Sequence, residues 1–217
     1  MMLAHRYSCI LLSALPLLAG CKSSEKALYG ATHSNHSVSI GKLPRLEAVV
    51  EAGPLNATEG ALPDDAPKVF RQELAYHLAE PQDSIGYGYA KLIVTQAEVT
   101  RTGRALQAFQ MMTLMTPSLF GLPLEWYRTQ VKAEVQIINS QGDVVGTYSG
   151  TGRSKVRVAM YHGYSQTAAP RLADVQGLRL ALDQIRPQLD TAALGLREKL
   201  QKAGPMEEVL GSAHTDE

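Results

Sequence analysis

This sequence contains few side chains suited to catalysis, and their spacing along the chain matches no catalytic motif. Ser-His-Asp catalysis needs a serine on a tight elbow and a histidine oriented by a carboxylate, but the chain holds no G-x-S-x-G. Inside the expected domain, His77 lies one position from the apolar Leu78, and His162 lies between Tyr161 and Tyr164. We interpret His162 as part of a packed loop corner, because no partner for it can be named. The sequence predicts no catalytic residue, no cofactor and no enzyme activity.

Two further patterns resemble ligand-binding motifs, but neither has the residue types and spacing that such a motif requires. His33 and His36 lie three apart, but no carboxylate or further histidine lies near them, so no metal site is predicted. The stretch "GTYSGTGRSK", residues 146–155, brings glycines close to a serine and a lysine, whereas a phosphate-binding loop requires G-x-x-x-x-G-K-[ST]. Counted from Gly146, position 151 is threonine, and the order of lysine and serine is reversed. A strand with bulges accounts better for these glycines.

Cys21 is the residue whose surroundings indicate a reaction. It follows Leu18-Ala19-Gly20 and a charge-free apolar run, residues 7–19, which begins directly after Arg6. A basic start, a short apolar segment and small residues at its end are typical of a secretory signal peptide. The run is shorter than the roughly 20 residues of a membrane-spanning helix. A thiolate is a nucleophile suited to taking up a lipid.

The four residues Leu18-Ala19-Gly20-Cys21 resemble the lipobox of bacterial envelope lipoproteins. The resemblance implies that residues 1–20 are removed as a signal peptide. It also implies a diacylglycerol thioether on Cys21 and a third acyl chain on its amino group, and two or more chains hold a protein stably at a membrane. Lys22 stands where enteric lipoproteins retained at the inner membrane have aspartate, so the resemblance implies the outer membrane, with the protein facing the periplasm.

Composition argues against other partners. Lys and Arg total 21, as do Asp and Glu, and the loss of Arg6 leaves 20 against 21. A chain so close to neutrality lacks the basic field that a phosphate backbone requires, so no nucleic acid partner is expected. Cys9 leaves with the signal peptide and Cys21 is acylated, so neither a disulfide nor a Cys/His zinc site is expected.

The secondary structure expected from the sequence begins with two strands separated by a helix. Residues 46–52 and 86–100 are rich in β-formers and predict two strands. Asp64 and Asp65 precede a proline, which predicts an acidic cap and a helix over residues 67–79.

A hairpin is expected next. Residues 130–137 alternate apolar with polar side chains, residues 139–143 form the turn, and residues 144–152 return as the second strand. The apolar side chains of the first strand are Val131, Ala133, Val135 and Ile137.

A long helix closes the chain. Apolar residues step by three and four from Pro170 to about Lys202, which predicts a helix with one buried stripe. Pro187 inside this run should kink or split the helix.

Together these elements predict an α+β fold: one mostly antiparallel or mixed sheet of about four strands, with helices packed on one face. The expected organisation is a signal peptide at 1–20, a lipidated N-terminus and flexible tether at 21–45, a single domain at 46–202 and a flexible tail at 203–217. The element order is similar to that of penicillin-binding-protein activator lipoproteins and of the N-terminal domain of the Tol–Pal translocation protein. That resemblance implies a non-enzymatic protein that binds another envelope protein.

Residues 105–124 contain no charged side chain. Their length would allow a membrane crossing, but Pro117 and Pro123 argue against a spanning helix. Two interpretations remain: a short helix to about Thr116 and a loop, both packed on the domain, or an exposed apolar flap that contacts a partner or a membrane. The flap would make contact through Met112, Met115, Phe120 and Leu122.

Two functions are compatible with this sequence. The first is a lipid-anchored accessory or protein-partner-binding module of the cell envelope, held to the membrane by the lipid on Cys21. The alternative is a binder of a small apolar ligand or lipid, with a hydrolase as a weaker possibility. A closed cavity lined by Tyr148, Tyr161 and Leu178 would favour the ligand binder, whereas an exposed apolar segment would favour a protein or membrane partner.

Overall fold

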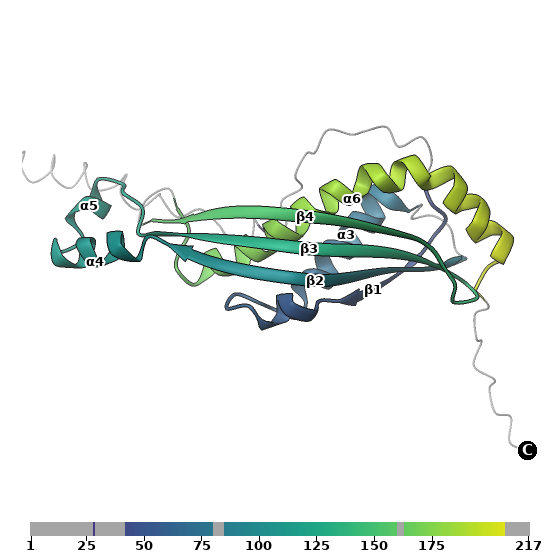
Figure 1. The fold of residues 1–217 in the computed structure, drawn as a ribbon, viewed down its shortest axis with the longest axis horizontal. Coiled ribbons are helices and arrows are strands. Elements are labelled where there is room, and N and C mark those ends of the chain that lie inside the picture. The colour runs from purple at the N-terminus through teal and green to yellow at the C-terminus, as the bar shows by residue number, and fades with distance from the viewer. Residues whose placement is uncertain (1–27, 29–41, 80–84, 160–162, 207–217) are drawn as a thin grey trace, which may run out of the picture.

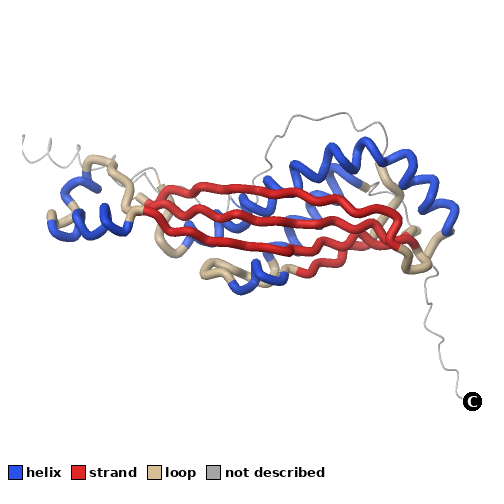
Figure 2. Tube along the Cα trace, viewed as in Figure 1, coloured by secondary structure: helices blue, strands red, loops and turns tan. Residues whose placement is uncertain are grey.

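The computed structural model describes residues 28, 42–79, 85–159 and 163–206 and has an α+β fold (Figures 1 and 2). Its centre is a four-stranded mixed sheet with the strand order β1-β2-β3-β4. The predicted fold class is therefore confirmed. The signal peptide, Cys21 and most of the expected tether and tail lie outside the described residues.

The sheet is built from one short strand and three long ones. Strand β1 (Glu47–Glu51) pairs in parallel with β2 (Gly88–Thr102), and β2 pairs antiparallel with β3 (Glu125–Asn139). Strand β4 (Val144–Val158) returns antiparallel to β3, which confirms the hairpin. Strands β2, β3 and β4 have 15 residues each, a length of about 50 Å.

The helical elements lie between and after the strands. They are the 3-10 helix η2 (Gly53–Ala57), helix α3 (Asp65–Glu73), the π turn η3 (Leu74–Leu78), helices α4 (Arg104–Met112) and α5 (Thr116–Leu119), and helix α6 (Ala168–Ala203). Helices α3 and α6 lie on the same side of the sheet (Figure 1), whereas α4 and α5 project beyond the end of the three long strands.

Helix α3 begins near the predicted position but is not capped as expected. Asp64 occupies the N-cap and its side chain makes no capping hydrogen bond. Asp65 is buried and forms an ion pair with Arg171 of α6, from Nε to Oδ2 at 2.7 Å. Asp65 therefore joins the start of α3 to α6, and neither the expected acidic cap nor its hydrogen bond to the free amide groups is formed by Asp64.

Helix α6 is one element of 36 residues and continues through Pro187 without splitting. It packs on β3 and β4 and follows a curved path over the sheet (Figure 1). The predicted apolar stripe is confirmed, because its large side chains are all buried: Leu172, Val175, Leu178, Leu182, Ile185 and Leu189.

Glycines allow α6 to lie very close to β4. A Cβ at Gly152 would lie 1.9 Å from the carbonyl oxygen of Gly177, and a Cβ at Gly150 would lie 2.3 Å from that of Ala181. Gly150 and Gly152 pair with β3 in regular register, and the irregularity of the hairpin lies instead between Ile137 and Ile138. The glycines at 150 and 152 therefore serve helix packing, not bulges as the sequence suggested.

A bulge does occur in β2, where the register shifts between Val94 and Gln96. The extra residue reverses the alternation, so that Ala97 and Arg101 lie on the same face as Val94. Beyond the bulge Arg101 pairs with Tyr127 of β3. The far half of β2 thus places a charged side chain on the face that α6 covers elsewhere.

The hydrophobic core includes part of the segment expected as a tether. Leu28 and Leu43 are both buried among the core side chains, and Leu43 bridges to Ala79. The packed part of the chain therefore begins before residue 46. No helix in the described part of the chain combines the length and the apolar character that a membrane crossing requires.

Candidate functional site

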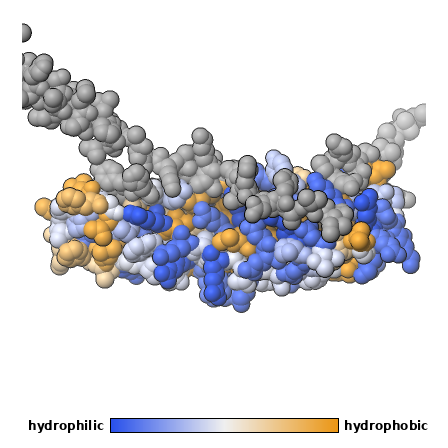
Figure 3. All heavy atoms as spheres, turned by 90° about the horizontal axis from the view of Figure 1, so that it is seen from above, coloured by the Kyte–Doolittle hydropathy of each residue, from blue (hydrophilic) through white to orange (hydrophobic). Residues whose placement is uncertain are grey.

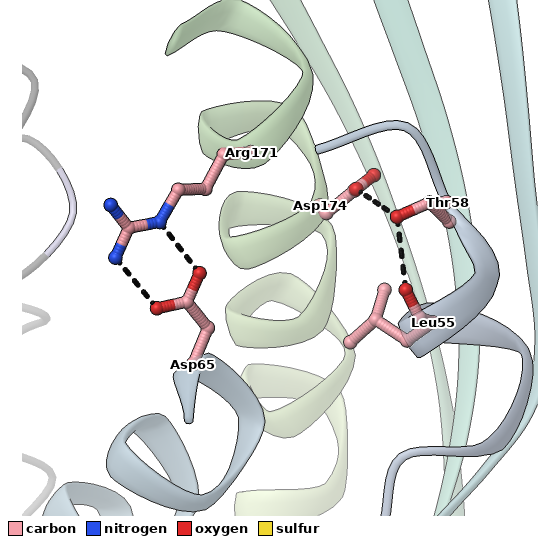
Figure 4. A network of polar contacts seen from close by, with 5 residues as sticks. All are labelled: Leu55, Thr58, Asp65, Arg171 and Asp174. Carbon is pink, nitrogen blue, oxygen red and sulfur yellow. Dashed lines mark hydrogen bonds and ion pairs between the residues drawn. The ribbon is translucent and has the colours of Figure 1, made fainter. Parts of the chain in front are cut away.

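The most deeply buried carboxyl group of the helical layer belongs to Asp174 of α6, which is 3% exposed. The Thr129 hydroxyl on β3 donates a hydrogen bond of 2.9 Å to Oδ1 of Asp174. The Thr58 hydroxyl lies 2.6 Å from Oδ2 and also 2.9 Å from the carbonyl oxygen of Leu55 (Figure 4). Three segments distant in sequence thus meet at one carboxyl group.

The hydroxyl groups around Asp174 can all donate to it. The Thr58 hydroxyl faces two acceptors, Oδ2 of Asp174 and the Leu55 carbonyl oxygen, and the latter also accepts the Thr58 amide at 3.3 Å. Burial raises the pKa of Asp174, and the nearby charge of Asp65 raises it further, against the opposing effect of the two threonine hydrogen bonds.

The space beside Asp174 does not accommodate a substrate. A cavity bordered by Leu55, Leu62, Arg171, Asp174 and Leu178 encloses about 10 Å³, roughly the space of one water molecule. In the ranges that the structure describes, no three metal-ligating side chains gather at one point. The group around Asp174 is therefore equipped to hold η2, β3 and α6 together.

Two ion pairs fasten α3 to α6. Arg171 contacts both carboxylate oxygens of Asp65, at 2.7 and 2.8 Å (Figure 4). Arg186 contacts both oxygens of Glu73, at 2.6 and 3.0 Å, and also Oδ1 of Asp183 at 2.9 Å. Bidentate pairs of this kind fix orientation as well as distance, so α3 and α6 form one helical layer over the sheet.

A third polar group lies where the long strands approach α4. Arg101 lies 4.7 Å above the ring of Tyr127, donates a hydrogen bond to its hydroxyl and lies 3.5 Å from Glu59. Glu125 is buried, with one carboxylate oxygen 3.8 Å from Arg101 and the other without a hydrogen-bond partner. Burial raises the pKa of Tyr127 more than the Arg101 hydrogen bond lowers it.

Beyond this group, α4, α5 and the turns around them form what we call the apolar tip, residues 104–122. Half of the strongly exposed large apolar side chains of the described residues belong to it, and Figure 3 shows them as one orange cluster at the end of the molecule. They are Phe109, Met111, Met112, Leu114, Leu119, Phe120 and Leu122.

Strained backbone shapes the turn between the two helices of the tip. Leu114 and Met115 have φ angles of 49° and 60°, a left-handed conformation that costs a non-glycine residue roughly 1–2 kcal/mol. The turn leaves the Leu114 side chain 89% exposed. Conformations of this kind gather at sites where function requires a particular shape.

The four predicted contact residues all lie on this tip. Met112 and Phe120 are each 85% exposed, Leu122 is 45% exposed, and Met115 is half-buried. The interpretation in which the segment packs on the domain does not describe these side chains. The predicted helix is present as α4 but ends at Met112, before the expected Thr116.

The other candidates are dispersed or lie outside the described residues. Cys21, Tyr161 and His162 belong to the undescribed part of the chain. His77 is half-buried beside Leu78 on η3. Tyr148 packs against the core and does not border the small cavity beside Leu178, so the cavity expected between these side chains is not formed by the described residues.

Sequence reasoning missed Asp174, Thr58 and Thr129 altogether. One signal was present: Asp174 lies four residues before Leu178 and therefore on the buried stripe of the final helix. A carboxyl group on such a stripe requires partners. The threonines that serve as those partners lie 116 and 45 residues away along the chain, so no local pattern could identify them.

Comparison with known proteins adds no relative from which a function could be transferred. No protein-family model matches this chain, and no curated protein or solved structure matches it either.

Proposed function

We propose that this chain is a non-enzymatic, lipid-anchored docking module of the bacterial cell envelope. Its lipid anchor is Cys21, at the outer membrane and facing the periplasm. The domain carries the apolar tip on a long β ribbon and uses it to dock on another component of the envelope. The sequence supports the anchor through the lipobox, and the tip supports the docking role.

The exposure of the tip is the observation that carries this proposal. Soluble proteins rarely expose contiguous apolar surface of this kind unless it serves an interface. The chain has no charged side chain from residue 105 to residue 124 to interrupt the surface. Methionines at 111 and 112 are both more than half exposed, and their flexible side chains adapt to irregular partner surfaces.

The base of the tip is rigid, which suits a docking element. Strands β2 and β3 enter and leave it as a regular antiparallel ladder that runs from the bulge to Thr102 and Trp126. Arg157 of β4 donates a hydrogen bond to the carbonyl oxygen of Gly121, and the Leu124 amide donates to the Val158 carbonyl oxygen at 2.8 Å. The apolar side chains are therefore held at a fixed position relative to the sheet.

The anchor is tested by Cys21→Ser in the full chain. We expect the variant to escape lipidation and to lose its fractionation with membranes, because Cys21 is the proposed attachment point for the acyl chains. A variant that is processed normally and still partitions like the parent would show that the anchor has been misassigned.

The docking role is tested with a photocrosslinking amino acid placed at Phe120 in intact cells. We expect efficient crosslinks from Phe120 to an envelope component. The matched control is the same amino acid at Leu194 of α6, which is also exposed but lies outside the tip. Equal crosslinking from the two positions, or none from either, would contradict a docking role for the tip.

A further inference from the structure

The apolar tip is polar inside and apolar outside. Gln110 is 0% exposed and Ser118 is buried as well. The Gln110 amide donates a hydrogen bond of 2.9 Å to the carbonyl oxygen of Pro123, and the Ser118 hydroxyl donates to Oε1 of Gln110. Polar side chains thus join α4 to α5, while Phe120 and its neighbours face outward.

This arrangement suits an apolar solvent better than water. In a lipid environment, polar groups must find partners within the protein, and apolar side chains can cover the outside. Gln110 supplies such partners on both sides of the tip, to Ser118 of α5 and to Pro123 before β3. A loop selected only for solubility would bury its leucines and phenylalanines and expose its glutamine.

Cationic side chains lie at the base of the tip, and three of the four are on the uncovered face of the sheet. Arg104 begins α4, and the strand residues that follow the tip on the uncovered face of the sheet form two cross-strand pairs, Trp126 with Arg157 and Arg128 with Lys155. We call the four cations the basic collar: Arg104, Arg128, Lys155 and Arg157. All four are exposed. Among the described residues, no carboxylate lies within ion-pair distance of any of them.

The chain as a whole is neutral, with 21 basic and 21 acidic residues, so this local excess of positive charge is a property of the fold. Trp126 lies within it, and the Lys155 ammonium is 5.4 Å from the centre of the Trp126 ring. Tryptophan beside lysine and arginine is typical of protein surfaces at the level of lipid headgroups.

The basic collar lies directly beside the apolar side chains. Arg157 donates a hydrogen bond to the carbonyl oxygen of Gly121, which follows Phe120, and Arg128 with Lys155 is the next cross-strand pair on the same face, about 7 Å further along the ribbon. Interfacial segments bury their apolar face roughly 5–10 Å into the boundary between headgroups and acyl chains. Cations this close to inserted side chains would meet the headgroups, where anionic lipids attract them.

From these observations we propose that the apolar tip docks on an anionic phospholipid bilayer. Its phenylalanine, methionine and leucine side chains enter the interface, and the basic collar binds the headgroup phosphates. This inference rests on the proposed docking function and names its target. A lipid surface accounts for the polar interior and the collar together, whereas a hydrophobic groove on a protein accounts only for the apolar exterior.

The test uses the full chain on vesicles, with one tryptophan as a depth probe. The chain contains a single tryptophan, so Trp126→Phe removes the background signal and Phe120→Trp places the probe on the tip. Leu194→Trp in the same background is the matched control, because Leu194 is 68% exposed but lies on the far part of α6. Vesicles contain brominated lipid as quencher and either phosphatidylglycerol with phosphatidylcholine or phosphatidylcholine alone.

We expect strong quenching of the probe at position 120 on anionic vesicles, weak quenching there on phosphatidylcholine alone, and little quenching at position 194 on either. Arg128→Gln with Lys155→Gln should weaken insertion roughly 30-fold, since each cation near an anionic surface contributes about a fivefold step in affinity. Quenching at 120 no stronger than at 194, or equal on the two kinds of vesicle, overturns the proposal.

The outcome also separates this inference from the proposed function. A crosslink from position 120 to an envelope protein, without quenching by lipid, overturns the lipid surface and leaves the docking role standing. If position 120 gives neither a crosslink nor quenching, both the lipid surface and the docking role are overturned. Acyl chains on Cys21 would bring positions 120 and 194 to the vesicle alike, so the difference in quenching between the two positions reports insertion of the tip itself.

Discussion

A methyl group added at Gly152 should loosen the contact between α6 and the sheet. The Cβ of Gly152→Ala would lie 1.9 Å from the carbonyl oxygen of Gly177 and 2.5 Å from the backbone nitrogen of Ala181. Both neighbours are backbone atoms of a helix, so neither can rotate away as a side chain would. The helix must move away from β4 or the strand must bend.

The expected cost follows from that geometry. Inserting one methyl group into a well-packed core costs about 1–3 kcal/mol, and the rigid backbone neighbours place Gly152→Ala at the upper end, about 3 kcal/mol. Alanine loses less backbone entropy on folding than glycine, which offsets roughly 0.5–1 kcal/mol of this. A domain of this size loses about 2–4 °C of melting temperature for each kcal/mol, so a decrease of several degrees is expected.

Gly195→Ala is the matched control, because a Cβ at Gly195 of α6 would meet nothing within 4 Å. It should raise stability by about 0.5–1 kcal/mol, the helix preference of alanine over glycine. Urea and thermal unfolding followed by far-ultraviolet circular dichroism measure both variants. If Gly152→Ala proved as stable as the parent, the close approach of α6 to β4 would be wrong.

Two further variants test the interior. Asp174→Asn should gain stability relative to the parent as pH rises above the ordinary aspartate pKa of about 4, by about 1.4 kcal/mol for each pH unit that separates the pKa of folded Asp174 from that ordinary value. The raised pKa of Asp174 in the folded state stabilises the parent below the ordinary aspartate pKa, and this contribution is lost as pH rises through the raised value. An unchanged difference between the two proteins across acidic and neutral pH, in urea titrations, would contradict a raised pKa of Asp174 in the folded state. Val135→Asp, at a fully buried position, should cost about 3–5 kcal/mol, whereas Lys132→Asp on the exposed face should change stability by less than about 0.5 kcal/mol. Equal melting shifts for the two would contradict the orientation of β3.

Periodicity alone predicted strand β3 and helix α6. The alternation of Val131, Ala133 and Val135 with polar residues predicted the hairpin, and steps of three and four predicted α6, because each pattern repeats the geometry of one element. The absence of charge over residues 105–124 indicated that this segment differs from its surroundings. Each of these signals is local, so the sequence contains it completely.

Close approaches and buried hydrogen bonds were decided only by the tertiary structure. A glycine is required at position 152 because Gly177, 25 positions further along the chain, packs against it. The extra residue between Val94 and Gln96 changes which side chains face the helices, and no local pattern marks that bulge. Asp174 acquires its raised pKa from burial against segments that the sequence keeps far apart.

The apolar tip shows the same division most clearly. The sequence alone shows the apolar composition of the tip, and it was sufficient to predict Met112, Phe120 and Leu122 as contact residues. The polar interior and the basic collar could not be predicted, since Gln110 contacts Ser118 only when two helices fold against each other. The collar joins cations from α4, β3 and β4 only because antiparallel strands bring residues 128 and 155 side by side. Sequence determines which side chains are available, and the folded chain decides which of them share a surface.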